Sequence, residues 1–252
     1  MWLLAVGLAS PCMASDSARE LMIVDALQAI KVGELVRMEA AGQAFVGLYT
    51  EAEQVANKGA VIILHDMGGF PDQKPVVSLL RTEFPHYQFS SLSLQMPLRE
   101  SGASVAEYYD LFPEAVARIQ AGVNLLKKKD VNNIVLIGYG LGGLMALAAQ
   151  SEKAMELKAL VLISLPVPVS EQKAVQTLAM LKKNKLPLLD VYADKDLADV
   201  IGSAREKRVA AKDNPLYRQL RIDSEEHAFR HQAGLLSKRI YSWVSRVALS
   251  AQ

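Results

Sequence analysis

The stretch IVLIGYGLGGLMAL, residues 134 to 147, constrains the fold more than any other part of the chain. An apolar run rich in β-branched residues stops at Gly138, four glycines fall within six residues from there, and a helical pattern begins. A buried strand, a tight turn and a helix in this order are typical of an α/β protein. Such a turn can serve two different chemistries, and other segments of the chain distinguish them.

Short apolar segments alternate with helical patterns along most of the remaining sequence. We predict strands at residues 60–64, 88–94, 134–137, 159–163, 186–192 and 216–222. We predict helices at residues 75–84, 105–129, 141–152 and 232–247, a helix or a loosely ordered lead-in at residues 18–30, and a β-hairpin over residues 34–52. This alternation predicts an α/β fold with a mostly parallel sheet, helices on both faces and an antiparallel hairpin at its start.

The first fourteen residues differ in character from the rest of the chain. An apolar run from Trp2 to Leu8 is followed by small residues, which is typical of a secretory signal peptide. We therefore predict a signal peptide at residues 1–14 and a single domain at residues 15–252. We also predict that the protein is exported, which in a bacterium means to the periplasm. The 252 residues suit one domain, and no linker or repeat divides them.

Composition excludes several function classes. The 28 basic and 27 acidic residues nearly cancel, so no overall field attracts nucleic acid. No stretch after the signal peptide is long and apolar enough for a transmembrane helix. Cys12 is the single cysteine and lies within the predicted signal peptide. We accordingly expect no disulfide, no thiolate metal site and, because no His, Asp or Glu cluster has ligand spacing, no metal at all.

The glycine turn fits two patterns. As G-x-G-x-x-G it would bind the pyrophosphate of a dinucleotide, which also requires an acidic residue at the end of the next strand. That strand ends in Ser164, Leu165 and Pro166. As G-x-S-x-G it would be the nucleophile elbow of a hydrolase, with Gly140 in the place of the serine. The missing acid makes dinucleotide binding the weaker hypothesis, and we expect no cofactor.

The elbow pattern makes further demands, and the chain meets them in order. It needs an oxyanion loop after an earlier strand, and residues 65–69, HDMGG, follow such a strand. It needs an acid after a later strand, where Asp194 and Asp196 stand, and a histidine before the last helix, where His227 stands.

These segments together resemble the α/β-hydrolase superfamily, and more narrowly a bacterial hydrolase-like family catalogued as a domain of unknown function. The resemblance implies an eight-stranded sheet with the site at the carboxyl ends of the strands. It places Gly140 at the nucleophile's position, Asp196 at the acid's and His227 at the base's, with Asp194 as the alternative acid. It also implies that the backbone amides of Met67 and Leu141 stand where the oxyanion donors would.

A glycine at the nucleophile position offers no side-chain oxygen, so the acyl-serine route is closed. Three substitutes remain: the Tyr139 phenol, the Ser164 hydroxyl, which we interpret as a helix cap or turn residue, and a water deprotonated by His227. His65 is expected to hold its loop, and Asp66 to cap the turn.

We therefore expect an exported protein with a degenerate triad, a pseudoenzyme that binds a small molecule or a partner protein in the retained cleft. The residues expected to line that cleft are His65, Asp66, Met67, Gly68, Gly69, Tyr139, Leu141, Asp196 and His227. The alternative is an esterase-like hydrolase using water activated by His227, and a lesser alternative is a dinucleotide-binding protein.

Overall fold

A computed structural model describes residues 15–53 and 57–249. The predicted signal peptide lies outside the described residues. The strands are β1 Glu34–Ala40, β2 Gln43–Thr50, β3 Gly59–Leu64, β4 Phe89–Leu94, β5 Ile134–Tyr139, β6 Ala159–Ile163, β7 Leu188–Lys195 and β8 Tyr217–Glu226. They form one sheet in the order β1-β2-β4-β3-β5-β6-β7-β8. The β1/β2 and β2/β4 pairs are antiparallel, and all later pairs are parallel. The predicted fold class is thereby confirmed.

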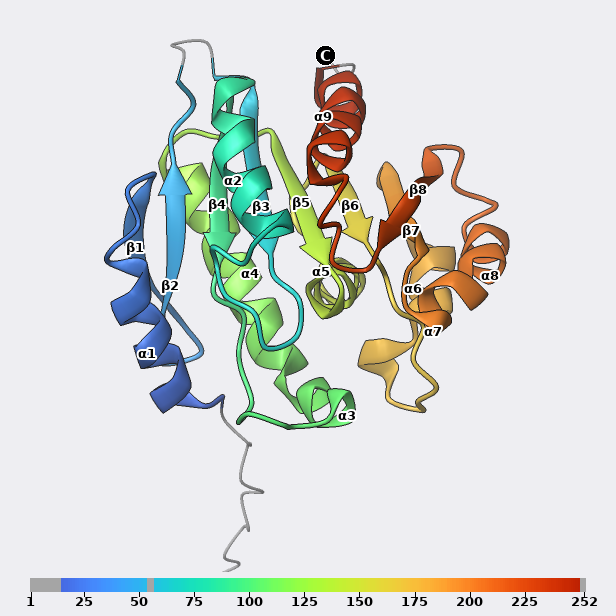
Figure 1. Ribbon diagram of the computed structural model, residues 1–252, viewed down its shortest axis with the longest axis horizontal. Helices are drawn as coiled ribbons and strands as arrows, with labels where there is room; N and C mark the ends of the chain where they lie inside the picture. The colour runs from blue at the N-terminus through green and yellow to red at the C-terminus, as the bar shows by residue number, and fades with distance from the viewer. Residues whose placement is uncertain (1–14, 54–56, 250–252) are drawn as a thin grey trace, which may run out of the picture.

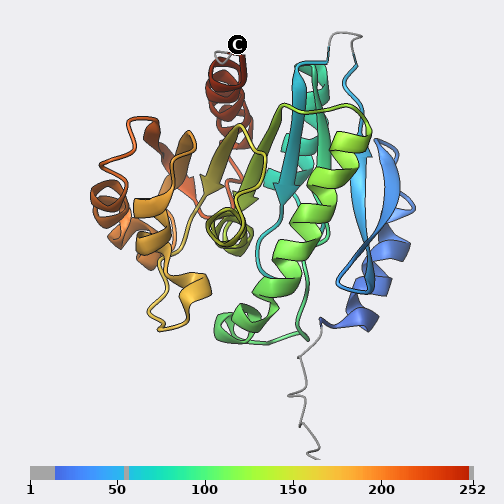
Figure 2. The same ribbon diagram turned by 180° about the vertical axis from the view of Figure 1, so that it is seen from behind.

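Helices cover both faces of this sheet (Figures 1 and 2). The α-helices are α1 Ser17–Leu27, α2 Val76–His86, α3 Val105–Tyr108, α4 Phe112–Lys128, α5 Leu141–Glu152, α6 Thr177–Lys183, α7 Ala198–Gly202, α8 Ala204–Ala210 and α9 Ala233–Leu249. Two short 3-10 helices lie at Tyr109–Leu111 and Lys173–Val175. Figure 2 shows α4 and α5 in front of the sheet, whereas α1, α2 and α9 lie behind it.

Burial follows from this layered arrangement. Every residue of β3, β4, β5 and β6 is buried, because a central parallel strand has helices above and below it. In the edge strand β1 only Ala40 is buried. One apolar core packs against α4 and α5, and a second packs against α2 and α9. The rigid central strands thus hold the loops at their carboxyl ends in fixed positions.

The prediction of one continuous helix over residues 105–129 is wrong. The structure divides it into α3, a 3-10 turn and α4, with Pro113 in the first turn of α4. Proline lacks a backbone N–H and is tolerated in a first helical turn but not in a helix interior. The proline was visible in the sequence and is the physical reason for the break.

Candidate functional site

Gly140 forms the turn between β5 and α5. Its backbone angles are φ 55° and ψ −121°, a region in which an L side chain is strained. A Cβ atom built on Gly140 would overlap the carboxylate of Asp66. A Cβ on Gly142 would overlap the backbone oxygen of His65, so α5 approaches the end of β3 more closely than another residue would allow.

Asp66 lies in the loop after β3, and its side chain reaches across to this turn. Its Oδ1 atom accepts hydrogen bonds from the backbone amides of Met67 and Leu141, each at 2.7 Å. These are the amides that the sequence resemblance identifies as oxyanion donors. Asp66 was expected only to cap its turn, and it does accept from the next amide, but it also fills the space beside Gly140.

His227 follows β8 and lies between two carboxylates. Its Nδ1 is 2.7 Å from Oδ1 of Asp196, and its Nε2 is 3.0 Å from Oδ2 of Asp66. The Tyr139 ring stacks on the imidazole at 5.2 Å between centroids, and its hydroxyl donates to the backbone oxygen of His227 at 2.9 Å. Tyr139 therefore positions both the imidazole ring and the backbone of His227.

Asp196 is held by several donors besides His227. Its Oδ2 accepts from the Ser164 hydroxyl at 2.6 Å and from the Ala193 amide at 3.0 Å, and its Oδ1 accepts from the Leu197 amide at 2.8 Å. Ser164 thus binds the acid instead of capping a helix. A register shift in the β7/β8 pair separates the two candidate acids, since Asp194 turns away and accepts from the Glu225 amide.

These contacts shift the pKa values of the pair. Burial alone lowers the pKa of His227, but the hydrogen bonds to Asp196 and Asp66 and the charges of both acids outweigh it and raise the pKa to about 9. Burial raises the pKa of Asp196, and its bonds to His227 and Ser164 more than reverse this, so the net direction is downward. At neutral pH the site therefore holds an imidazolium between two carboxylates, with no lone pair free on the ring.

His65 holds the loop that carries Asp66. Burial lowers its pKa to about 4, so the ring is neutral. Its Nδ1 donates to the backbone oxygen of Asp66 at 2.7 Å, and its Nε2 accepts from the Met96 amide at 2.9 Å. Gly69 closes the same turn through its amide, which donates to the Asp66 oxygen at 3.0 Å, while Gly68 has φ 69°.

The cavity at this site is small and apolar. It measures about 10 Å³, which is room for roughly one water molecule. Its apolar lining is formed by Met67, Met96, Pro97, Tyr108, Leu141 and Met145. Met67 is 43% exposed, and the side chains of Asp66 and His227 are 21% and 22% exposed.

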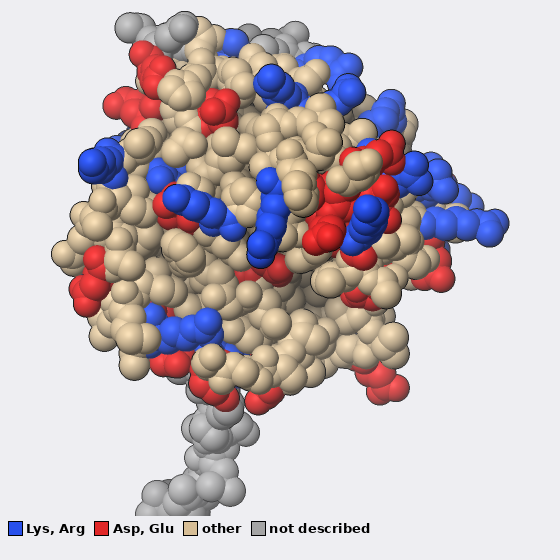
Figure 3. All heavy atoms as spheres, in the orientation of Figure 1, with Lys and Arg blue, Asp and Glu red and all other residues tan. Residues whose placement is uncertain are grey.

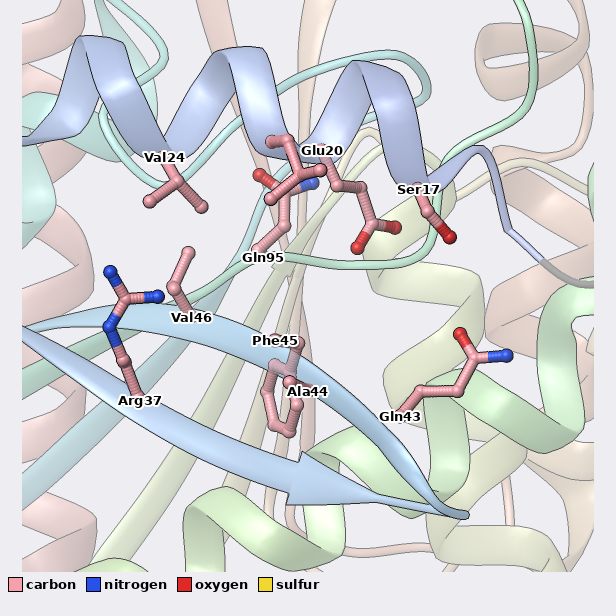
Figure 4. A pocket seen from close by; sticks show the side chains of 10 residues that line it. Ser17, Glu20, Val24, Arg37, Gln43, Ala44, Phe45, Val46 and Gln95 are labelled. Atoms are coloured by element: carbon pink, nitrogen blue, oxygen red, sulfur yellow. The ribbon is translucent and has the colours of Figure 1, made fainter.

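A larger hollow of about 190 Å³ lies between α1 and the β1/β2 hairpin (Figure 4). Val46 points into it from the hairpin toward Val24, and Glu20 enters from α1. Gln95 also lines it and contacts Nε2 of His65 at 3.1 Å. The hollow contains none of the residues around Gly140, so it is separate from the candidate site.

Three further observations concern charge, metals and membranes. Basic and acidic side chains are interspersed on the face shown in Figure 3. Among residues 15–53 and 57–249, no group of three or more His, Cys, Asp or Glu side chains is placed to hold a metal ion. In the same part of the chain, no helix combines the length and the apolar character that crossing a membrane requires.

Comparison with solved structures shows which fold family this architecture matches. Est1E from Butyrivibrio proteoclasticus is 16% identical with a TM-score of 0.65, over 84% of this chain and 98% of its own. An alpha-beta serine hydrolase homologue from Coxiella burnetii is 14% identical with a TM-score of 0.67, over 84% and 98%. An esterase from Pyrococcus furiosus is 16% identical with a TM-score of 0.68, over 85% and 92%. At such identities the likeness shows the α/β-hydrolase fold alone.

Sequence comparison gives one family. Residues 8–117 and 112–246 match the family described as "Protein of unknown function (DUF3530)". No curated protein sequence matches the chain.

Proposed function

The chain belongs to the DUF3530 family of proteins of unknown function, and from that premise we propose that it is an exported protein that receives a small molecule at the Asp66–His227 site without using a serine nucleophile. A partner protein docking on the same loops is the second form of this proposal. In both forms, Gly140 takes the position of the nucleophile in a hydrolase triad, Asp196 takes that of the acid, and His227 takes that of the base.

One observation carries this proposal. The carboxylate of Asp66 fills the space beside Gly140 in which a serine side chain would stand. The same carboxylate accepts hydrogen bonds from the Met67 and Leu141 amides, which would otherwise stabilise the oxyanion of a substrate. Acyl transfer by the triad route therefore lacks both its nucleophile and its free oxyanion donors.

The geometry argues against the two substitute nucleophiles on neighbouring strands. Ser164 is only 1% exposed, and its hydroxyl donates to Oδ2 of Asp196, whereas His227 bonds to Oδ1 of the same acid. Burial and the charges of Asp66 and Asp196 raise the pKa of Tyr139, so its phenol stays protonated at neutral pH. Neither group is an activated nucleophile in this arrangement.

The geometry also argues against the two alternative functions, hydrolysis by water activated at His227 and dinucleotide binding. A water-activating base needs a free ring nitrogen, whereas both nitrogens of His227 carry protons bonded to carboxylates below about pH 9. A dinucleotide phosphate would need the Leu141 amide at the start of α5, and Asp66 already binds that amide with a negative charge of its own.

A fluorophosphonate probe tests the absence of serine chemistry. We expect no labelled peptide from the purified chain under conditions that label an active serine esterase. A labelled peptide that contains any serine of this chain would overturn the proposal. Export is tested separately by mass spectrometry of the mature protein, for which we expect an N-terminus near Ser15.

A further inference from the structure

The two oxygens of Asp66 have different environments. Oδ1 accepts from two backbone amides at 2.7 Å each, whereas the one donor side chain that Oδ2 meets among the described residues is His227, at 3.0 Å. When a carboxylate is alkylated to an ester, one oxygen becomes the carbonyl oxygen and the other carries the alkyl group. If Oδ2 carried an alkyl group, the carbonyl oxygen would already lie between the donors that stabilise an oxyanion.

We propose that Asp66 is the nucleophile of a hydrolytic reaction at saturated carbon, in which Oδ2 attacks an alkyl group bearing an anionic leaving group. This inference rests on the proposed absence of serine chemistry and names the class of small molecule. The place left vacant at Gly140 is filled by a nucleophile from another loop.

The first step forms a bond between Oδ2 and the alkyl carbon and breaks the bond from that carbon to the leaving group. The leaving group departs with the electron pair, as a halide does, on the side opposite Oδ2. It needs no proton from His227, which lies beside Oδ2. Acyl substrates are disfavoured because the Met67 and Leu141 amides are already bound to Oδ1 and cannot polarise a second carbonyl.

The second step hydrolyses the aspartyl ester. Alkylation removes the negative charge of Asp66, which is among the causes that raise the pKa of His227, so the imidazolium releases its proton to solvent. The neutral ring then takes a proton from water, whose oxygen adds to Cγ while Oδ1 carries the negative charge. The Cγ–Oδ2 bond breaks, and Oδ2 leaves in the alcohol with that proton. In sum, one alkyl halide and one water give one alcohol and one hydrogen halide.

The lining of the site suits an alkyl group. Met67, Met96 and Met145 surround the small cavity beside Asp66. Methionine side chains are flexible and repack around apolar ligands at low cost, so a cavity of about 10 Å³ can widen for a short chain. No charged side chain other than Asp66 contributes to the described lining of that cavity.

Butyl bromide and butyl iodide are suitable probes. We expect the wild-type protein to release halide from them, and the His227→Gln variant to accumulate one butyl group per chain, mapped to the peptide that contains Asp66. The variant accumulates the ester because it can be alkylated but lacks the base for hydrolysis. Asp66→Asn should show neither halide release nor the adduct. Asp194→Asn is the matched control, since Asp194 bonds to the Glu225 amide and should leave both results unchanged.

Water enriched in heavy oxygen gives a second readout that does not depend on a variant. In a single turnover the heavy oxygen should enter the Asp66 carboxylate and not the butanol. Heavy oxygen in the butanol alone, or no butyl adduct on Asp66 in folded His227→Gln with either halide, would overturn this inference. Either result leaves the proposed absence of serine chemistry standing, because only fluorophosphonate labelling overturns that.

Discussion

The Asp66 carboxylate occupies the volume in which a side chain on Gly140 would lie. Gly140 is in the elbow after β5, whereas Asp66 follows β3, so the two meet only through the parallel pairing of those strands. Because Asp66 also binds the Met67 and Leu141 amides, a change at either position alters the other's environment. Substitutions at Gly140 and Asp66 should therefore be strongly non-additive.

Gly140→Ser alone should not create a serine hydrolase. The new side chain overlaps Asp66, and its backbone conformation costs about 1 to 3 kcal/mol for a residue other than glycine. We expect lower stability in urea unfolding and no fluorophosphonate labelling.

The double variant Gly140→Ser with Asp66→Gly should behave differently. Removing the carboxylate gives the serine room and frees both amides and Nε2 of His227. We expect fluorophosphonate labelling at residue 140, hydrolysis of nitrophenyl acetate, and higher stability than the two single changes add up to. Equal labelling of the single and the double variant would show that Asp66 does not block the site.

Asp66→Asn should lower the pKa of His227 from about 9 toward the value of roughly 6.5 that is usual for histidine. The asparagine keeps the shape of the side chain but removes the negative charge next to the ring. Titration of the imidazole resonances by NMR measures the shift. Asp194→Asn should leave the titration unchanged, because Asp194 has no contact with His227 among the described bonds. An unshifted His227 in Asp66→Asn would contradict the ion pair.

Stability should fall as the pH rises from neutral to alkaline. His227 has a higher pKa folded than unfolded, so its contribution is fully present below about pH 6.5 and is lost as the pH rises through about 9. The loss is at most about 3 to 4 kcal/mol, because each pKa unit between the usual value of about 6.5 and the folded value of about 9 corresponds to about 1.4 kcal/mol. Urea unfolding at several pH values measures it, and His227→Gln should flatten this part of the profile. An unchanged alkaline profile in that variant would assign the loss to other groups.

Much of the fold was predictable because its causes are local or periodic. Apolar runs of strand length predicted the buried strands, and the order of glycine turn, acid and histidine predicted which loops meet. Parallel strands bring their carboxyl ends to one edge of the sheet, so the proximity of His227 to Asp196 at 2.7 Å follows from chain order.

The role of Asp66 was not predictable in the same way. Whether its side chain remains in its own turn or crosses to Gly140 depends on a few ångströms of loop geometry, which no periodic pattern records. One signal was available: a missing side chain at Gly140 leaves a space, and Asp66 is a polar residue on the loop that the resemblance places beside it. Ser164 was missed for a similar reason, since its partner Asp196 lies on another strand.

The docking of α1 should depend on one buried ion pair. Arg118 is 1% exposed and donates from Nη2 to both carboxylate oxygens of Glu20, at 3.1 and 2.9 Å. Glu20→Ala removes this partner and leaves Arg118 with Glu114 as its remaining acid, and breaking a buried pair typically costs about 3 to 5 kcal/mol. We expect a loss near the lower end, about 3 kcal/mol, in urea unfolding, because Glu114 still balances the charge.

Asp25→Ala, on the exposed side of the same helix, should change stability by no more than about 0.5 kcal/mol. Equal losses in the two variants would mean that helix propensity, and not the ion pair, holds α1 in place.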